Sequence, residues 1–124
     1  MNYEGLWWAA GGAESGWGIN LAHQEDTIFA TWFTYDLDGT PMWLVVTAGK
    51  TAPGMYTGTL YRTTGPAFSA VPFDPSHVAI TAVGSATLTF ANGNTGTFSY
   101  TVNGVAQAKA ITRQVFSGNG TVCQ

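Results

Sequence analysis

The sequence predicts an all-β fold, an eight-stranded antiparallel up-and-down β-barrel, and three observations lead to this prediction. Apolar and polar residues alternate along most of the chain, and no segment shows a helical period. Thr, Val and aromatic residues are abundant, and Gly or Asn marks a turn about every dozen residues. Eight short strands in 124 residues suit one barrel domain, and a two-sheet β-sandwich is the alternative.

The turns delimit the expected strands in chain order. Gly11-Gly12 ends the first strand, and Glu25-Asp26 is a two-residue turn. Leu37-Asp38-Gly39 fits a three-residue hairpin with Gly39 in the left-handed conformation, and Asn103-Gly104 is the strongest hairpin signal in the chain. We therefore expect strands at residues 4–10, 16–24, 27–36, 41–49, 55–63, 83–91, 95–102 and 105–116.

One long segment interrupts this alternation. Residues 65–82 contain three Pro residues together with Phe68 and Phe73. We expect a long ordered loop, because its aromatic side chains favour burial, and we expect it to cover one end of the fold. The whole chain, residues 1–124, is then a single β-barrel domain with this loop and a loose tail at 117–124. Cys123 in the tail is the only cysteine, expected as a free thiol or as a bridge to another chain or to a neighbouring segment of a longer protein.

Turn lengths also predict the strand register. The two-residue turn sets Ile19 opposite Trp32, and the three-residue turn sets Trp32 opposite Leu44. The expected inner face then contains Trp17, Ile19, Leu21, His23, Ile28, Ala30, Trp32, Met42, Leu44 and Val46. The expected outer face contains Asn20, Phe29, Thr31, Phe33, Tyr35, Trp43, Val45 and Thr47. This outer face is aromatic, so it is covered by another subunit, covered by the long loop, or exposed as a platform for a sugar ring.

The second half of the chain pairs an apolar face with a solvated face rich in Thr. In its last strand, a regular turn at Asn103-Gly104 sets Lys109 opposite Phe98. Lys109 and Arg113 would then face the barrel interior, where two cations could hold a carboxylate ligand. A one-residue bulge would instead turn the cations outward, and we favour it because small residues pack well inside a narrow barrel. The residues turned inward would be Ala106, Ala108, Ala110 and Thr112.

Composition excludes several classes of partner. Charged residues are 9% of the chain, against about 25% in a typical soluble domain. The net charge is −3 with four basic residues, which argues against nucleic acid and anionic membranes. No apolar run approaches the roughly 20 residues that span a bilayer, so no membrane insertion is expected, and the first residues lack a secretory signal. Two His and one Cys predict no metal site, and no motif predicts a cofactor.

Several segments together resemble a known pattern. They are Ser15-Gly16-Trp17-Gly18-Ile19-Asn20-Leu21, His23-Gln24, residues 28–36, Gly39, Pro41, Trp43-Leu44, residues 61–66, residues 108–114 and a Cys near the end. The chain resembles a domain of unknown function found in bacterial secreted and surface proteins, with Glu25 where that pattern has Gly. The resemblance implies an extracellular or cell-surface location and implies no activity. More loosely, Gly5-x-Trp7 is similar to the opening of avidin and lipocalin barrels, which implies a cup-shaped fold.

These observations favour a non-catalytic extracellular binding module for a carbohydrate or other small ligand, in a protein that self-associates. The candidate ligand-binding residues are Trp8, Trp17, Asn20, Phe33, Tyr35, Trp43, Lys109 and Arg113. The alternative is a structural or oligomerisation domain whose aromatic face is a subunit interface. A third hypothesis is a small β-barrel enzyme of unknown reaction that uses Glu14, His77, Lys109 or Arg113, although no sequence motif supports it.

Overall fold

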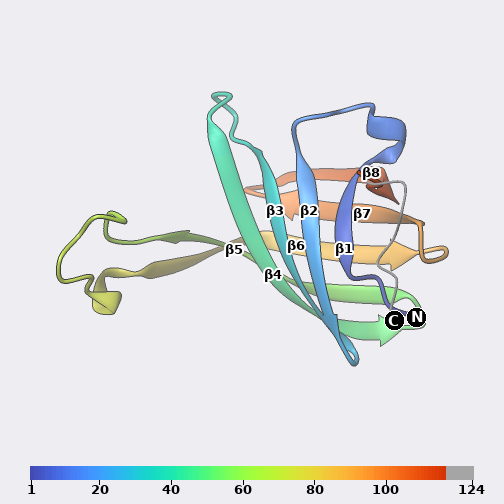
Figure 1. The fold of residues 1–124 in the computed structure, drawn as a ribbon, viewed down its shortest axis with the longest axis horizontal. Coiled ribbons are helices and arrows are strands. Elements are labelled where there is room, and N and C mark those ends of the chain that lie inside the picture. Colours follow the sequence, from blue (N-terminus) through green and yellow to red (C-terminus); the bar gives the residue numbers. More distant parts are fainter. Residues whose placement is uncertain (117–124) are drawn as a thin grey trace.

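The computed structural model of the protein describes residues 1–116, so the expected tail at 117–124, with Cys123, lies outside the described residues. Within them, the strands form a closed barrel in sequence order, with every neighbouring pair antiparallel and β8 returning to pair with β1 (Figure 1). The predicted up-and-down barrel is therefore confirmed, and the sandwich alternative is wrong.

The strand boundaries agree with the prediction at most turns. The strands are β1 (Gly5–Ala9), β2 (Gly18–Gln24), β3 (Thr27–Tyr35), β4 (Pro41–Ala52), β5 (Met55–Thr64), β6 (Ala79–Phe90), β7 (Thr95–Val102) and β8 (Val105–Arg113). Two single-turn 3-10 helices, η1 (Ala10–Gly12) and η2 (Pro75–His77), complete the regular structure of the described part. No helix within residues 1–116 has the length and apolar character that crossing a membrane requires.

The predicted register is confirmed at each tight hairpin. Ile19 lies opposite Trp32, and Trp32 lies opposite Leu44. Asn103 and Gly104 both have positive φ, 48° and 85°, as a two-residue hairpin of this kind requires. Glu25 also has positive φ, 53°, so the β2–β3 turn places a bulky L-residue in the left-handed region that Gly would occupy at lower cost.

Side chains fill the middle of the barrel. The buried residues include Trp7, Ile19, Leu21, Ile28, Leu44, Leu60, Leu88, Phe98 and Ile111, each at most 1% exposed. Burying each large side chain stabilises the fold by roughly 1.5–3 kcal/mol, so the interior is the main source of stability. The expected inner face is confirmed, and the cup implied by the looser resemblance is not present in the packed middle of the barrel.

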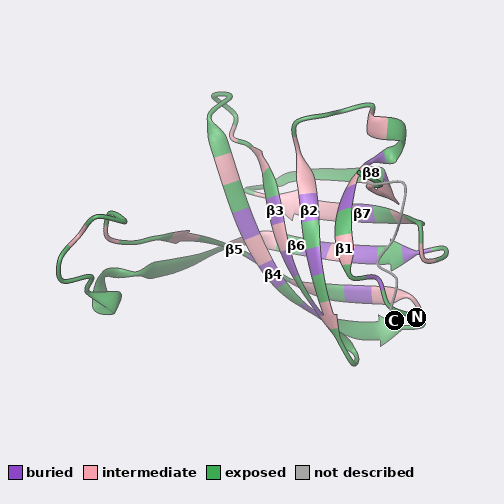
Figure 2. Cartoon of the chain, viewed as in Figure 1, coloured by how far each residue is buried: buried purple, intermediate pink, exposed green. Residues whose placement is uncertain are grey.

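The long segment between β5 and β6 does not cover the barrel. The pairing of the two strands continues through Thr64 and Ala79, and the resulting ribbon projects away from the barrel at the left of Figure 1. Phe68 at its tip is 99% exposed, and Figure 2 shows the projecting segment as largely exposed. The expectation that this loop covers one end is wrong, because strand pairing satisfies its backbone and extends it away from the barrel.

The last strand corrects a second expectation. The β7–β8 pairing is regular, with Lys109 opposite Phe98, and the bulge that we favoured is absent. Ala106, Ala108 and Ala110 are exposed, and Lys109 and Arg113 lie on the inner side. The inward positions of these two cations are tolerated because their charged groups reach polar partners at the two ends of the barrel. Lys109 forms an ion pair with Glu14 at one end, and Arg113 donates to a backbone carbonyl at the other.

Candidate functional site

The aromatic outer face predicted for β3 and β4 is uncovered in the described chain. Phe29, Phe33, Tyr35 and Trp43 are each between 46% and 53% exposed. The β5–β6 ribbon leaves these rings open, so cover by the long loop is excluded. The outer face of β6–β8, by contrast, presents mainly Thr, Ser and Ala. Among the described strands, the exposed aromatic rings therefore lie on β3, β4 and β5.

A groove, which we call the outer groove, opens where β1 separates from β2. The β1–β2 pairing ends at Trp7 and Ile19, and β1 continues instead along β8, with Trp8 opposite Thr112. The depression at this place has a volume of about 400 Å³, within the usual size of ligand sites. Its lining residues are Leu6, Trp7, Trp8, Ser15, Gly16, Trp17, Gly18, Ile19, Asn20, Phe33 and Gln114.

Two glycines allow aromatic rings to pack beside the outer groove. A Cβ on Gly12 would lie 3.1 Å from the Trp8 ring, and a Cβ on Gly16 would lie 3.1 Å from the Tyr35 hydroxyl oxygen. Both glycines also have positive φ, 72° and 122°, which L side chains rarely adopt. The loop between β1 and β2 is therefore shaped so that the Trp8 and Tyr35 rings rest directly on backbone.

The polar groups of the outer groove are uncharged. Asn20, Ser15 and Gln114 offer amide and hydroxyl groups, and none of the lining residues is ionisable. The nearest ion pair is Glu14 with Lys109, whose amine donates to both carboxylate oxygens at 3.0 Å. Trp17 Nε1 also donates to Glu14, at 2.9 Å. These hydrogen bonds from Trp17 and then Lys109 lower the pKa of Glu14, and the bond to Glu14 raises the pKa of Lys109.

A second, smaller cavity lies at the mouth of the barrel, the end where β3, β5 and β7 terminate. Its volume is about 160 Å³, below the usual range for ligand sites. Trp32 and Tyr100 lie in its wall with ring centroids 4.4 Å apart, and the Tyr100 hydroxyl donates to Gln107 at 2.7 Å. Burial raises the pKa of Tyr100. Trp32 Nε1 is buried and has no hydrogen-bond acceptor among residues 1–116.

The opposite end of the barrel is sealed by aromatic rings. The Tyr3 ring stacks on the rings of Phe90 and His23, with centroid distances of 3.9 and 5.6 Å. The Tyr56 ring packs edge-on against the same two rings, Phe90 and His23. The His23 Nδ1 atom accepts from the Tyr3 backbone N–H, and Nε2 donates to the Glu25 carbonyl. The ring of His23 is therefore a structural hydrogen-bonding group in this seal.

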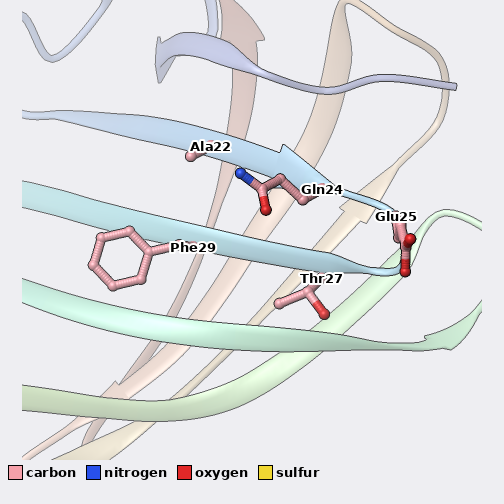
Figure 3. Close-up of a pocket in the computed structure, with 5 residues that line it drawn as sticks. All are labelled: Ala22, Gln24, Glu25, Thr27 and Phe29. Carbon is pink, nitrogen blue, oxygen red and sulfur yellow. The ribbon is translucent and has the colours of Figure 1, made fainter.

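A more spacious surface hollow, about 630 Å³, lies on the β2–β3 hairpin (Figure 3). Its lining comes from that hairpin alone: Ala22, Gln24, Glu25, Thr27 and Phe29. It offers the single aromatic ring of Phe29 and includes the ionisable Glu25, whereas the outer groove has several aromatic rings and no ionisable residue in its lining. We therefore assign the candidate site to the smaller outer groove.

The structure brings together some of the predicted site residues and separates the others. Trp8, Trp17, Asn20 and Phe33 line the outer groove. Tyr35 packs at its edge over Gly16 and also lines the mouth cavity, and Trp43 lies outside the groove, opposite Phe33 on β4.

The two predicted cations lie outside the outer groove. Lys109 is engaged with Glu14, and Arg113 donates to the carbonyls of Gly93 and Glu4 near the sealed end while its guanidinium sits 5.0 Å over the Trp7 ring. Sequence reasoning missed Leu6, Ser15 and Gln114. The Gln114 N–H donates to the Leu6 carbonyl, a contact that depends on how the barrel closes.

Of the residues considered for catalysis, Glu14 and Lys109 meet, and the other two lie elsewhere. Glu14 pairs with Lys109, whereas His77 lies exposed on the projecting ribbon and Arg113 lies toward the sealed end. Within residues 1–116, no group of three or more His, Cys, Asp or Glu side chains is placed to hold a metal ion.

No protein-family model, no curated protein and no solved structure matches this chain. The functional assignment therefore depends on the geometry of the described residues.

Proposed function

We propose that this protein is a non-catalytic binding module that holds a neutral carbohydrate in the outer groove. One observation carries the proposal: Trp8, Phe33, Asn20 and Gln114 line a depression of about 400 Å³ that contains no ionisable side chain. Four residues predicted from the sequence as ligand-binding, Trp8, Trp17, Asn20 and Phe33, meet in this one place.

The chemistry of the lining suits a sugar ring. A pyranose presents C–H groups on its faces and hydroxyl groups around its edge. Aromatic faces carry negative charge density, so they attract the C–H faces and bury apolar area. Amide side chains such as Asn20 and Gln114 both donate and accept hydrogen bonds, which matches hydroxyl groups. A charged ligand would find no opposite charge in the lining, so neutral sugars are favoured.

An array of neutral oligosaccharides, followed by titration calorimetry with those retained, tests the proposal. We expect Trp8→Ala to weaken binding at least about tenfold, because an aromatic contact contributes roughly 0.5–1.5 kcal/mol beyond its buried area. Asn20→Ala should weaken binding through lost hydrogen bonds. Phe29→Ala is the matched control, since Phe29 is an exposed aromatic residue of the same wall outside the outer groove.

Two results would contradict the proposal. One is the absence of binding to any neutral oligosaccharide by the folded protein. The other is equal loss of binding in the Trp8 and Phe29 variants, because a non-specific aromatic surface, and not the groove, would then hold the sugar.

An extracellular or cell-surface setting is part of this proposal. It is supported by the resemblance of residues 15–44 to a pattern found in bacterial secreted and surface proteins. An antibody should detect the protein on intact cells of the native host or in their culture medium, and detection only after lysis would argue against this setting.

A further inference from the structure

The ribbon that projects from the barrel has no partner within the described chain. We call residues 62–81 the arm. Its two strands pair with each other, from Arg62 opposite Thr81 to Thr64 opposite Ala79. The pairing of β5 with β4 ends at Tyr61, and the pairing of β6 with β7 begins only at Gly84. Each arm strand therefore has one free edge, an arrangement that favours association with another chain.

The arm carries large apolar side chains that are exposed to solvent, although side chains of this kind are usually buried. Their exposed fractions are 99% for Phe68, 94% for Val71, 51% for Phe73, 42% for Val78 and 66% for Ile80. Together they present roughly 500–600 Å² of apolar surface, taking about 150 Å² for each fully exposed side chain, the lower end of the range for aromatic rings, because Val and Ile are smaller. Asp74 and His77 are the ionisable residues of its outer part, and the two side chains lie 3.7 Å from each other.

A second uncharged surface lies beside the base of the arm. Tyr61 is opposite Val45, and Trp43 shares their outer face two residues along β4. We call Trp43, Val45 and Tyr61 the Trp43 surface; Trp43 is 48% exposed and Tyr61 is 37% exposed. Arg62 beside it is neutralised by Asp36, whose carboxylate accepts from the guanidinium at 3.0 Å.

We infer that a second copy of this chain covers both surfaces, with the arm of each copy packed on the Trp43 surface of the other. The arm begins next to the Trp43 surface, so a two-fold axis near its base lays each arm across the partner barrel. Such a self-complementary contact closes at two copies. Two arms and the two surfaces that receive them bury roughly 1,300–1,700 Å², within the 1,200–2,000 Å² that specific interfaces usually bury.

This interface is independent of the proposed sugar site. The arm and the Trp43 surface contribute no residue to the outer groove. A variant that breaks the dimer should keep the sugar site, and Trp8→Ala should keep the dimer. Failure of one proposal therefore leaves the other testable.

Sedimentation velocity over about a hundredfold range of protein concentration tests the inference on the full chain. The native chain should be a dimer that dissociates on dilution. Phe68→Ser with Phe73→Ser, and separately Trp43→Thr, should each raise the dimer dissociation constant by about thirtyfold or more, as truncation at the centre of an interface does. Circular dichroism and Trp fluorescence establish that each variant is folded.

Matched controls use equally exposed residues away from both surfaces. Leu37→Ser changes an apolar residue that is 92% exposed in the β3–β4 turn, and Phe29→Thr changes a ring that is 46% exposed on the same wall near the sealed end. Both should leave the dimer unchanged. A native chain that stays monomeric throughout, a dimer that survives the arm and Trp43 substitutions, or open-ended polymers in place of a dimer would each overturn the inference.

Discussion

The two ends of the barrel are built from the same strands but finished in different ways. At one end, Tyr3, His23, Tyr56 and Phe90 stack into a seal. At the other end, β5 and β6 leave the barrel as a ribbon, and the mouth keeps a cavity of about 160 Å³ beside Trp32 and Tyr100. The outer groove also opens toward this mouth, where the β1–β2 loop lies.

This difference separates stability from recognition. Residues of the sealed end bury their rings against one another and against backbone, which leaves little surface for a partner. The open end retains exposed rings, free strand edges and uncharged polar groups, which cost stability in isolation and suit binding. The proposed sugar site and the proposed dimer interface both lie toward the open end of the barrel.

Removing the central ring of the seal should have the largest effect. Phe90 is 7% exposed and contacts Tyr3, Trp7 and Tyr56. We expect Phe90→Ala to lower the free energy of unfolding by about 3–5 kcal/mol, as truncation of a buried aromatic does. Urea denaturation measures this, with the exposed Phe29→Ala as control. An equal loss of unfolding free energy in the two variants would contradict the inference that the sealed end stabilises the fold.

The guanidinium at the sealed end should contribute less. Arg113 Nε and Nη2 donate to the Gly93 carbonyl at 3.0 and 2.9 Å, and Nη1 donates to the Glu4 carbonyl. Arg113→Lys keeps the charge but loses this fork, so we expect a loss of about 1.5–3 kcal/mol. Arg62→Lys, at an exposed ion pair, should cost far less. A loss at Arg113 no larger than at Arg62 would show that the fork contributes little.

The hairpin turns at the two ends allow a stabilising test. Glu25 at the sealed end has φ of 53°, whereas the Asn103-Gly104 turn at the open end uses residues suited to positive φ. Glu25→Gly should raise the free energy of unfolding by about 0.5–1 kcal/mol, since the relieved strain exceeds the entropy cost of Gly. Asn103→Gly should change it little. Thermal denaturation of the two variants measures the difference. A lower stability of Glu25→Gly would contradict the inference that Glu25 strains the turn.

The ion pair near the open end should have the smallest effect, and its effect depends on pH. The pKa of Glu14 is lowered below 4.5 by Trp17 and Lys109, so its stabilisation is present above pH 4.5 and is lost as pH falls through the lowered value. The pKa of Lys109 is raised above 10.5, so its contribution is present below pH 10.5 and is lost as pH rises through the raised value.

A double-mutant cycle of Glu14→Gln and Lys109→Gln measures this coupling. The coupling energy should be small, reduced by salt and confined to the interval between those two limits. A coupling that persists at pH 2 would contradict the assignment, because the protonated Glu14 carboxyl no longer carries the charge.

Sequence reasoning predicted the fold well because its signals are local. Alternation identified the eight strands, and the turns at Glu25-Asp26, Leu37–Gly39 and Asn103-Gly104 determined the register of the strands that they join. A short turn allows one register in which the apolar face of one strand lies beside the apolar face of the next. The inward position of Trp32 and the outward positions of Phe33 and Trp43 follow from this register.

Sequence reasoning was less successful where partners are distant along the chain. The bulge expected in β8 was wrong because the partners of Lys109 and Arg113 are Glu14, 95 residues away, and Glu4, 109 residues away. The long loop was expected to cover the barrel because its aromatics favour burial. The structure instead extends the β5–β6 pairing, which satisfies the backbone and leaves Phe68 exposed.

The sequence by itself therefore determined the all-β class, the strand order along the chain and the face on which each side chain of the tight hairpins lies. Only the tertiary structure decided how β1 meets β8, which residues form the outer groove, and where the arm points. The physical reason is chain separation: a two- or three-residue turn fixes the register of its own strands, whereas the β1–β8 closure and the course of the arm depend on contacts between segments that no short turn connects.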